Sequence, residues 1–203
     1  MFDETAPFEQ ARNVAGTLAS DRYWLLTWTT YGTHLPGDRR GFVSPVADGQ
    51  GGTTIHNVPG TDYDEDDKIQ RNLARAQMKH DPVYLDAGQA DAVVGQFIET
   101  SRVRRWRLLS AAVMREHAHV ALGVPGDPDP SDLLRDLKSY ASRALNRNSR
   151  RAGSWWTESG SKRKLPHETA VFGAVKYVLD QKFALAVWCA EIPELSIQGG
   201  RIV

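Results

Sequence analysis

The sequence predicts an α+β protein in which a small ferredoxin-like antiparallel sheet is covered by helices on one face. Two observations carry this prediction. Short segments rich in aromatic and β-branched residues alternate with longer segments of helical spacing, and the two middle strand segments are close enough along the chain to form a hairpin. The resulting order is strand, Gly-rich insertion, helix, strand, strand, helix, helix, strand, within 203 residues of which 41% are hydrophobic.

The first strand is predicted over Tyr23–Thr30, because YWLLTWTT consists mainly of aromatic, aliphatic and β-branched residues. A connection rich in glycine and proline follows to about Gly60, and connections of this length are usually functional or mobile. An acidic first turn favours a helix over Asp64–Lys79. Pro82–Asp86 is short and is expected to be extended.

The middle of the chain is predicted to form a helix followed by a β-hairpin. Apolar residues recur near helical spacing over Ala87–Arg102. Trp106–Val113 and His117–Val124 are strand segments separated by a short connection, which predicts that they pair antiparallel.

The last part of the chain is predicted to contain two helices and a final strand. Asp129 is suited to cap a helix and is followed by a proline at the first helical position, so we expect a helix over 130–147. Residues 148–166 form a basic, tryptophan-containing loop or strand, 167–182 the last helix, and 185–192 the final strand.

The composition is typical of a globular protein of a reducing compartment. The single cysteine, Cys189, excludes an internal disulfide. The start of the chain is acidic and lacks the apolar segment of a secretory signal, and the longest apolar run, Phe183–Ala190, is too short to span a bilayer. We therefore expect a cytoplasmic protein without a membrane partner.

Positive charge is concentrated in one part of the chain, although the formal net charge is zero. From Arg135 to Lys164 there are nine basic and two acidic residues, a local net charge of +7, whereas residues 62–67 form an acidic run. A local patch of this size matters more to a polyanion than the total charge does. The pattern fits a nucleic-acid surface or, alternatively, a solvated helix face followed by a loop.

The segment His117-Ala118-His119 is the first candidate site. Alternate residues of a strand point to the same face, so the two histidines share a face with two small residues, Ala121 and Gly123. Two imidazoles at this spacing can converge on one divalent ion, although two protein ligands do not complete a metal site. The alternative is the exposed polar face of a half-buried strand.

The helix over 130–147 carries the second candidate. Its apolar residues form one stripe, and Tyr140 lies at the margin of that stripe, beside Arg143 and Arg147 on the polar side. A phenol among cations is suited to attack a phosphate group. The alternative is a tyrosine that packs at the edge of a hydrophobic core.

A third candidate is the pair Trp155-Trp156, which is followed by the basic residues Lys162, Arg163 and Lys164. Aromatic side chains beside cations can stack on bases while the cations contact phosphates. Two core tryptophans and a solvated loop would produce the same pattern.

In this order, the segments resemble the single-tyrosine HUH transposases, which comprise small insertion-sequence transposases and REP-associated tyrosine transposases of bacteria. The His-hydrophobe-His triplet is His117-Ala118-His119 within VMREHAHVALGV, and DLLRDLKSYASRALNR contains Tyr140 on the helix that follows. YWLLTWTTYGTHLPGDRRGF and WWTESGSKRKLP also look like this family, so the resemblance extends over about 23–188.

The resemblance implies a ferredoxin-like domain that binds Mg²⁺ or Mn²⁺ through His117 and His119 and cuts single-stranded DNA near a hairpin. Tyr140 would attack a phosphodiester, form a 5′-phosphotyrosine and release a 3′-hydroxyl, and reversal of this step with a new strand would rejoin the DNA. The residues expected to contact DNA are Arg143, Arg147, Lys162, Arg163, Lys164, Arg39 and Arg40.

The expected organisation is a single nuclease domain of the transposase type over 21–192, with an insertion at about 32–80. Residues 1–20 form a lead-in and 193–203 a tail. The protein is expected to be cytoplasmic and associated with the nucleoid, and either a monomer or a homodimer.

One position departs from the family pattern. Family members often carry a third polar metal ligand one helical turn after the tyrosine, where this chain has Ala144. Asp136, Glu116 or the substrate phosphate could complete the metal shell instead. Two alternative functions follow: a hairpin-DNA-binding protein with weak or no catalysis, and an RNA-binding sheet module, which strand aromatics such as Trp28 and Trp106 suggest.

Overall fold

The computed structural model describes residues 20–38, 45–47, 53–55, 66–149 and 151–191. The predicted tail, the lead-in up to residue 19, and both Arg39 and Arg40 lie outside the described residues. The elements are β1 (Arg22–Thr29), β2 (Pro45–Ala47), β3 (Thr53–Ile55), α2 (Lys68–Ala76), α3 (Ala87–Arg104), β4 (Arg107–Val113), β5 (His117–Val124), α4 (Pro130–Arg147), β6 (Ser161–Lys164), α5 (Glu168–Leu179) and β7 (Ala186–Cys189).

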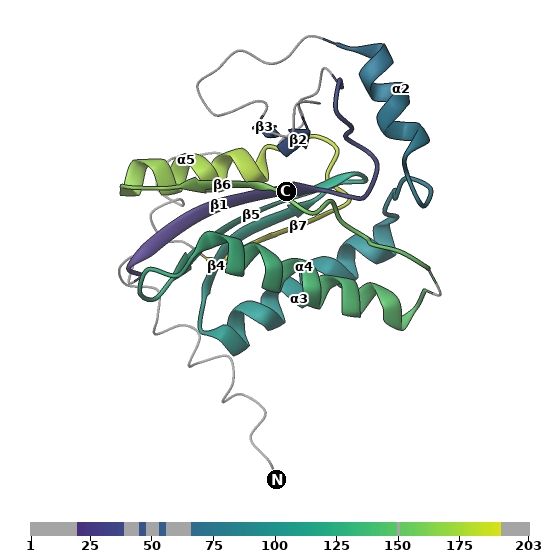
Figure 1. Ribbon diagram of the computed structural model, residues 1–203. Helices are drawn as coiled ribbons and strands as arrows, with labels where there is room; N and C mark the ends of the chain where they lie inside the picture. Colours follow the sequence, from purple (N-terminus) through teal and green to yellow (C-terminus); the bar gives the residue numbers. More distant parts are fainter. Residues whose placement is uncertain (1–19, 39–44, 48–52, 56–65, 150, 192–203) are drawn as a thin grey trace.

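The main sheet has the strand order β6-β1-β5-β4-β7, and each neighbouring pair is antiparallel (Figure 1). Apart from β2, β3 and α2, which stand between β1 and α3, the elements β1, α3, β4, β5, α4 and β6 give the order βαββαβ. These four strands lie in the sheet in the order fourth, first, third, second. This is the ferredoxin-like arrangement, so the predicted fold class is confirmed. β4 and β5 form the predicted hairpin, and β7 extends the sheet beyond β4.

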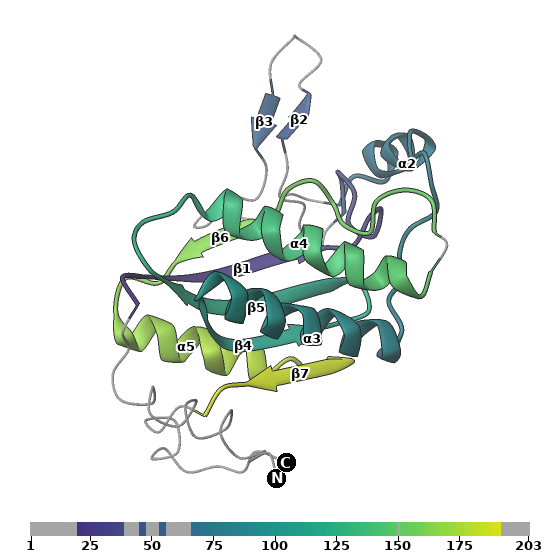
Figure 2. The same ribbon diagram turned by 90° about the horizontal axis from the view of Figure 1, so that it is seen from below.

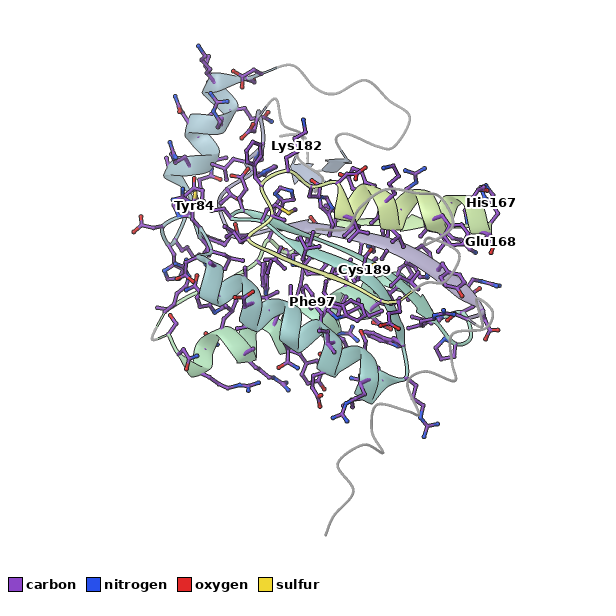
Figure 3. The ribbon with its side chains drawn as sticks, turned by 180° about the vertical axis from the view of Figure 1, so that it is seen from behind. Tyr84, Phe97, His167, Glu168, Lys182 and Cys189 are labelled. Carbon is purple, nitrogen blue, oxygen red and sulfur yellow. The ribbon has the colours of Figure 1, made fainter. Side chains whose placement is uncertain are left out.

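Helices α3 and α4 lie side by side and cover one face of the sheet (Figures 1 and 2). Under them lie the β5 side chains that alternate with the histidines, Ala118, Val120 and Leu122. Phe97 of α3 points toward the sheet (Figure 3) and meets Trp28 of β1 edge to face, with ring centroids 5.5 Å apart. This layer contains the larger hydrophobic core.

Helix α5 covers the opposite face of the sheet, whereas the sequence predicted helices on one face only (Figure 1). The reason is that β1 and β5 carry apolar side chains on both faces. Leu25 and Ala121 point away from α3 and α4 and form a second core with Val175 and Val178 of α5. A sheet with two apolar faces needs a covering layer on each.

Helix starts follow the capping chemistry that the sequence indicates. The side chain of Asp129 accepts a hydrogen bond from the backbone N–H of Ser131 at 2.8 Å, and Pro130 is the first helical residue, as predicted. Asp67 caps α2, while the start predicted at Asp64 lies outside the described residues. Of the helices that the structure describes, none is long and apolar enough to cross a bilayer.

The two tryptophans between α4 and β6 belong to the core. Trp155 and Trp156 are each 4% exposed, so their rings are not available to stack on bases. Their indole N–H groups donate to the Oδ1 of Asn146 (2.7 Å) and to the carbonyl of Lys138 (3.1 Å). The third candidate site therefore reduces to the basic residues that follow the pair.

Lys138 fastens the connection before β6 to helix α4. Its side chain is buried, and its ammonium donates to the carbonyl oxygens of three consecutive residues, Thr157, Glu158 and Ser159, at 2.7–3.1 Å. Burial and, to a smaller degree, the neighbouring Lys162 lower the pKa of Lys138 to about 8. At neutral pH the group is therefore still mainly charged and has three protons for its three acceptors.

Replacing Lys138 by methionine is expected to lower the free energy of unfolding by roughly 2–4 kcal/mol, because three carbonyl oxygens in a largely buried connection lose their donor. Urea denaturation followed by tryptophan fluorescence measures the loss. The matched control is Lys176→Met on the exposed side of α5, which removes only a surface ion pair with Asp180 and should cost about 0.5 kcal/mol. Equal losses in the two variants would contradict the role given to Lys138.

Candidate active site

The histidines of the triplet project from β5 on the face that α5 covers. Thr27 of β1 is paired in register with His119, and its hydroxyl lies 2.7 Å from Nδ1 of that histidine. The ring centroids of His117 and His119 are 5.0 Å apart, with the rings nearly perpendicular. The next small residue on this face, Ala121, lies in the core beneath α5, so the helix fills part of the space expected above the strand.

His119 is held in its neutral form. The residue is 4% exposed, and burial, with a smaller contribution from the charge of His117, lowers its pKa to about 3. A neutral imidazole is the form that binds a metal ion. When Nδ1 donates its proton to the hydroxyl of Thr27, Nε2 presents the lone pair, which is the usual arrangement for a metal-binding histidine.

A tyrosine that the sequence reasoning did not single out lies against this histidine. The ring of Tyr177, on α5, is 5.1 Å from the ring of His119 between centroids and is inclined to it by 75°. Tyr177 is 48% exposed, so its ring rests on the site while part of the side chain stays open to solvent. One helical turn later, Gln181 donates a hydrogen bond from its side-chain amide to the carbonyl of Tyr177 at 2.9 Å.

A third imidazole lies on the other side of the pair. The ring of His34, in the connection after β1, is 6.3 Å from that of His117 between centroids, and its Nε2 is 3.6 Å from the carboxylate of Glu116. The backbone N–H of Thr30 donates to the carbonyl of Glu116 at 2.8 Å, which joins this connection to the turn before β5. The sequence contains no signal for the path of this connection, so His34 could not be predicted as a neighbour of the site.

Tyr140 is not brought together with the histidines. It lies on α4, whose apolar stripe packs on the opposite face of the sheet. Its ring is flanked there by two guanidinium groups, those of Arg143 at 4.9 Å and Arg104 at 5.9 Å from the ring centroid. Asp136, considered as a metal ligand, is paired with Arg104 at 2.8 Å.

The basic residues predicted to contact DNA are distributed over both faces. On β6, Arg163 is paired in register with Leu25 and so lies on the histidine face, whereas Lys162 and Lys164 lie on the face of α4. Lys162 donates to the hydroxyl of Ser131 at 3.0 Å. On α4, Arg143 covers the ring of Tyr140, and Arg147 donates to the side chain of Gln96 at 2.9 Å.

The side chains at this site fit a metal ion only in part. Within the described ranges, no three His, Cys, Asp or Glu side chains are grouped closely enough to hold one. His117 and His119 could supply two nitrogen ligands, and an amide oxygen of Gln181 or a phosphate oxygen of a substrate would be needed to complete the set. Imidazole nitrogens combined with oxygen ligands suit a divalent transition ion such as Mn²⁺.

Acid is expected to destabilise the protein partly through His119. Its pKa in the folded protein, about 3, lies below the unfolded value of 6.5, so the unfolded chain takes up the proton first and stability falls as the pH drops from 6.5 towards 3. In His119→Gln, the loss of stability between about pH 7 and pH 4 should be smaller by on the order of 3 kcal/mol. Urea denaturation in metal-free buffer measures it; identical pH dependence in both proteins would exclude this contribution.

Comparison with proteins of known structure identifies a similar chain, a REP-associated tyrosine transposase bound to a REP hairpin. The TM-score is 0.42 and the sequence identity 15%, over 79% of this chain and 66% of that chain, so this chain spans just under two thirds of the neighbour's length. No protein-family model and no curated protein sequence matches the chain.

Proposed function

We propose that this protein is a metal-dependent HUH tyrosine transposase that cuts and rejoins single-stranded DNA, and that Tyr177 is its nucleophile. The observation that carries the proposal is the contact of the Tyr177 ring with His119 on the histidine face of the sheet, with the tyrosine half exposed. A phenol at this place can reach a phosphate bound beside the two imidazoles. Tyr140, on the other side of the sheet, is replaced by Tyr177 in this proposal.

The residue one helical turn after each tyrosine supports the same choice. The resemblance to the HUH family implies a polar metal ligand at that position. Gln181 stands there relative to Tyr177, whereas Tyr140 is followed at the same spacing by Ala144, a buried residue that cannot bind a metal. Ala144 was the reason to consider a DNA-binding protein without catalysis. That reason does not apply to a site that contains Tyr177.

The proposed reaction conserves bonds and charge. The phenol oxygen of Tyr177 attacks the phosphorus atom, its proton passes to solvent, and the bond from phosphorus to the 3′ oxygen breaks while that oxygen takes up a proton. The product is a 5′-phosphotyrosine and a free 3′-hydroxyl. Because the phosphotyrosine bond retains the energy of the phosphodiester, a new 3′-hydroxyl can reverse the step without a nucleotide cofactor.

The chain's own residues bind and orient the substrate around this step. His117, His119 and Gln181 are the residues proposed to hold a divalent metal ion. When bound, such an ion polarises the scissile phosphate and positions it. Thr27 fixes the ring of His119 through the contact with Nδ1, and Arg163 offers a cation on the same face.

The proposed substrate is single-stranded DNA beside a hairpin, as the resemblance to the family implies. A single strand is required because the scissile bond must enter a site beside α5 rather than remain within a stacked duplex. The structural neighbour holds a REP hairpin, which makes a hairpin oligonucleotide from beside the gene the natural probe.

The decisive test compares the two tyrosines. In the presence of Mn²⁺ and labelled hairpin DNA, the wild-type protein and Tyr140→Phe are expected to form a covalent adduct that survives detergent, whereas Tyr177→Phe is expected to form none. Gel electrophoresis of the denatured mixture detects the adduct. His119→Ala and a chelator should each reduce adduct formation by at least about a hundredfold, since the phosphate is then no longer polarised.

If Tyr177→Phe still forms the adduct and Tyr140→Phe does not, the nucleophile is Tyr140 on α4 and the assignment of Tyr177 is wrong. Absence of an adduct in the wild-type protein, together with tight binding of the hairpin, would instead support a binding protein without chemistry. Both tyrosine variants keep the aromatic ring, so neither removes the packing against His119 or against the arginines of α4.

Replacing Gln181 by alanine is expected to weaken Mn²⁺ binding about tenfold, because the metal loses one of three protein ligands. Titration of Mn²⁺ followed by electron paramagnetic resonance measures the affinity directly, without DNA or catalysis. Gln96→Ala on α3, which lies on the opposite side of the sheet, is the control and should leave the affinity unchanged. An affinity that is the same in both variants would remove Gln181 from the metal site.

A further inference from the structure

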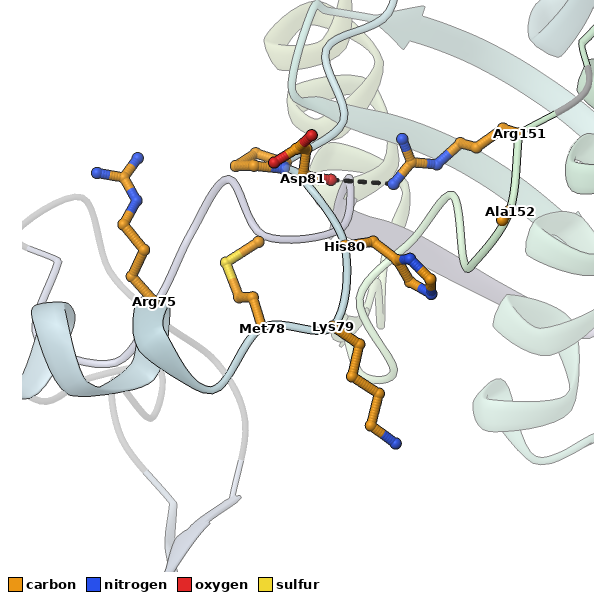
Figure 4. A pocket seen from close by; sticks show the side chains of 8 residues that line it. Arg75, Met78, Lys79, His80, Asp81, Arg151 and Ala152 are labelled. Carbon is orange, nitrogen blue, oxygen red and sulfur yellow. Dashed lines mark hydrogen bonds between the residues drawn. The ribbon is translucent and has the colours of Figure 1, made fainter.

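A polar cavity lies where the end of α2 and the segment after it meet the connection between α4 and β6 (Figure 4). Its volume is about 650 Å³, which is within the range of small-molecule and nucleotide pockets. It is lined by the C-terminal end of α2, by the segment that follows this helix, and by Arg151 and Ala152. None of these residues takes part in the proposed metal and tyrosine site.

The cavity carries positive charge. Arg75, Lys79 and Arg151 line it with a single carboxylate, that of Asp81, so its formal charge is +2. Arg151 is held in place, because its guanidinium donates to the backbone carbonyl of Asp81 at 3.0 Å and lies 5.8 Å from the ring centroid of Trp155. Lys79 and Arg75 are exposed and extend from the rim (Figure 4).

Two glycines with positive φ shape the wall of the cavity. Gly32 (φ +72°) packs against the side chain of Met78, and Gly153 (φ +91°) packs against the ring of His80. The positive φ favours glycine at both positions, and at Gly153 a Cβ atom would also collide with the ring of His80. The ring of His80 also faces Tyr31, with centroids 6.3 Å apart. The cavity is thus built from fixed contacts between three separate parts of the chain.

Hydrogen bonds of Thr30 and Tyr31, which directly follow β1, connect this cavity to the histidine site. The backbone N–H of Tyr31 donates to the carbonyl of Trp155 (2.9 Å), and its carbonyl accepts from Val83 (2.9 Å). The preceding residue, Thr30, donates to the carbonyl of Glu116, directly before His117. The two sites therefore lie at the same end of the sheet, on either side of this strand end.

We propose that the cavity binds a phosphodiester group of the DNA strand whose cleavage site lies at Tyr177, with Lys79, Arg75 and Arg151 as its cations. This inference rests on the proposed function for the identity of the polyanion. Guanidinium and ammonium groups that line a pocket of this size suit a nucleotide phosphate. The cavity would hold the strand at a fixed distance from the scissile bond.

The test combines two changes, an uncharged phosphate analogue in the DNA and an uncharged side chain in the cavity. Hairpin oligonucleotides that each carry one methylphosphonate are bound to the Tyr177→Phe protein, so that no cleavage occurs, and affinity is measured by fluorescence anisotropy. One methylphosphonate outside the cleavage site should weaken binding about tenfold. In Lys79→Gln or Arg151→Gln, the same substitution should cost less than about twofold, because the contact is already lost.

The salt dependence of binding provides a second readout. The slope of log affinity against log salt should become shallower by about 0.7 in Lys79→Gln, as expected for one lost contact with a single strand. Arg102→Gln, an exposed change on α3 at a side chain paired with Glu99, should leave both the slope and the methylphosphonate profile unchanged. Lys79 is exposed, so Lys79→Gln is expected to fold normally and a change in its DNA affinity reports the lost contact.

The outcomes separate this inference from the proposed function. If wild-type protein forms the covalent adduct but no methylphosphonate position is coupled to Lys79 or Arg151, the cavity does not bind the strand and the nuclease assignment stands. If the coupling is found but no adduct forms, the cavity binds DNA and the nuclease assignment fails. Coupling to Arg102 as strong as to Lys79 would also overturn the inference, since the effect would then be one of total charge.

Discussion

The alternation of side chains along β5 is the constraint on which the rest of the structure depends. Ala118, Val120 and Leu122 point into the core under α3 and α4, which forces His117 and His119 onto the other face. A helix packed on the first face cannot reach these imidazoles, because the sheet stands between them. The only described helix over the second face is α5, so the fold itself decides which helix can bring a side chain to the histidines.

Most of the fold could be predicted from the sequence because its signals are local. The strand period placed β5 at its observed bounds, the proline after Asp129 marked the start of α4, and a short connection marked the hairpin of β4 and β5. The face that α5 covers could not be read in the same way, since the pattern of one helix does not say which side of a sheet it meets. The apolar side chains of β1 at Tyr23 and Leu25 were the available clue, because they indicate a second buried face.

The sequence pointed to His117, His119 and Tyr140 as site residues, whereas the nucleophile proposed from the structure is Tyr177. Tyr140 has the local features expected of a nucleophile, a phenol at the edge of an apolar stripe with arginines beside it, and the structure explains them as cation–π packing with Arg143 and Arg104. Tyr177 lacks such neighbours in the sequence. Its distinguishing properties are the contact with His119 across the second core, which leaves little trace in the order of residues, and Gln181 four residues later, which the sequence does show.

The strand end at Thr30 and Tyr31 gives the site a rigid frame that sequence patterns do not reveal. The hydroxyl of Thr30 is buried and donates to the carbonyl of Val83 at 2.6 Å, while its backbone N–H donates to Glu116. Buried polar groups of this kind specify one arrangement, because any other would leave them without partners. Three connections, after β1, before α3 and before β5, are therefore fixed relative to one another. A DNA strand that contacts both the cavity and the histidines would meet a surface whose spacing is already set, so less ordering would be needed when the scissile phosphate is bound.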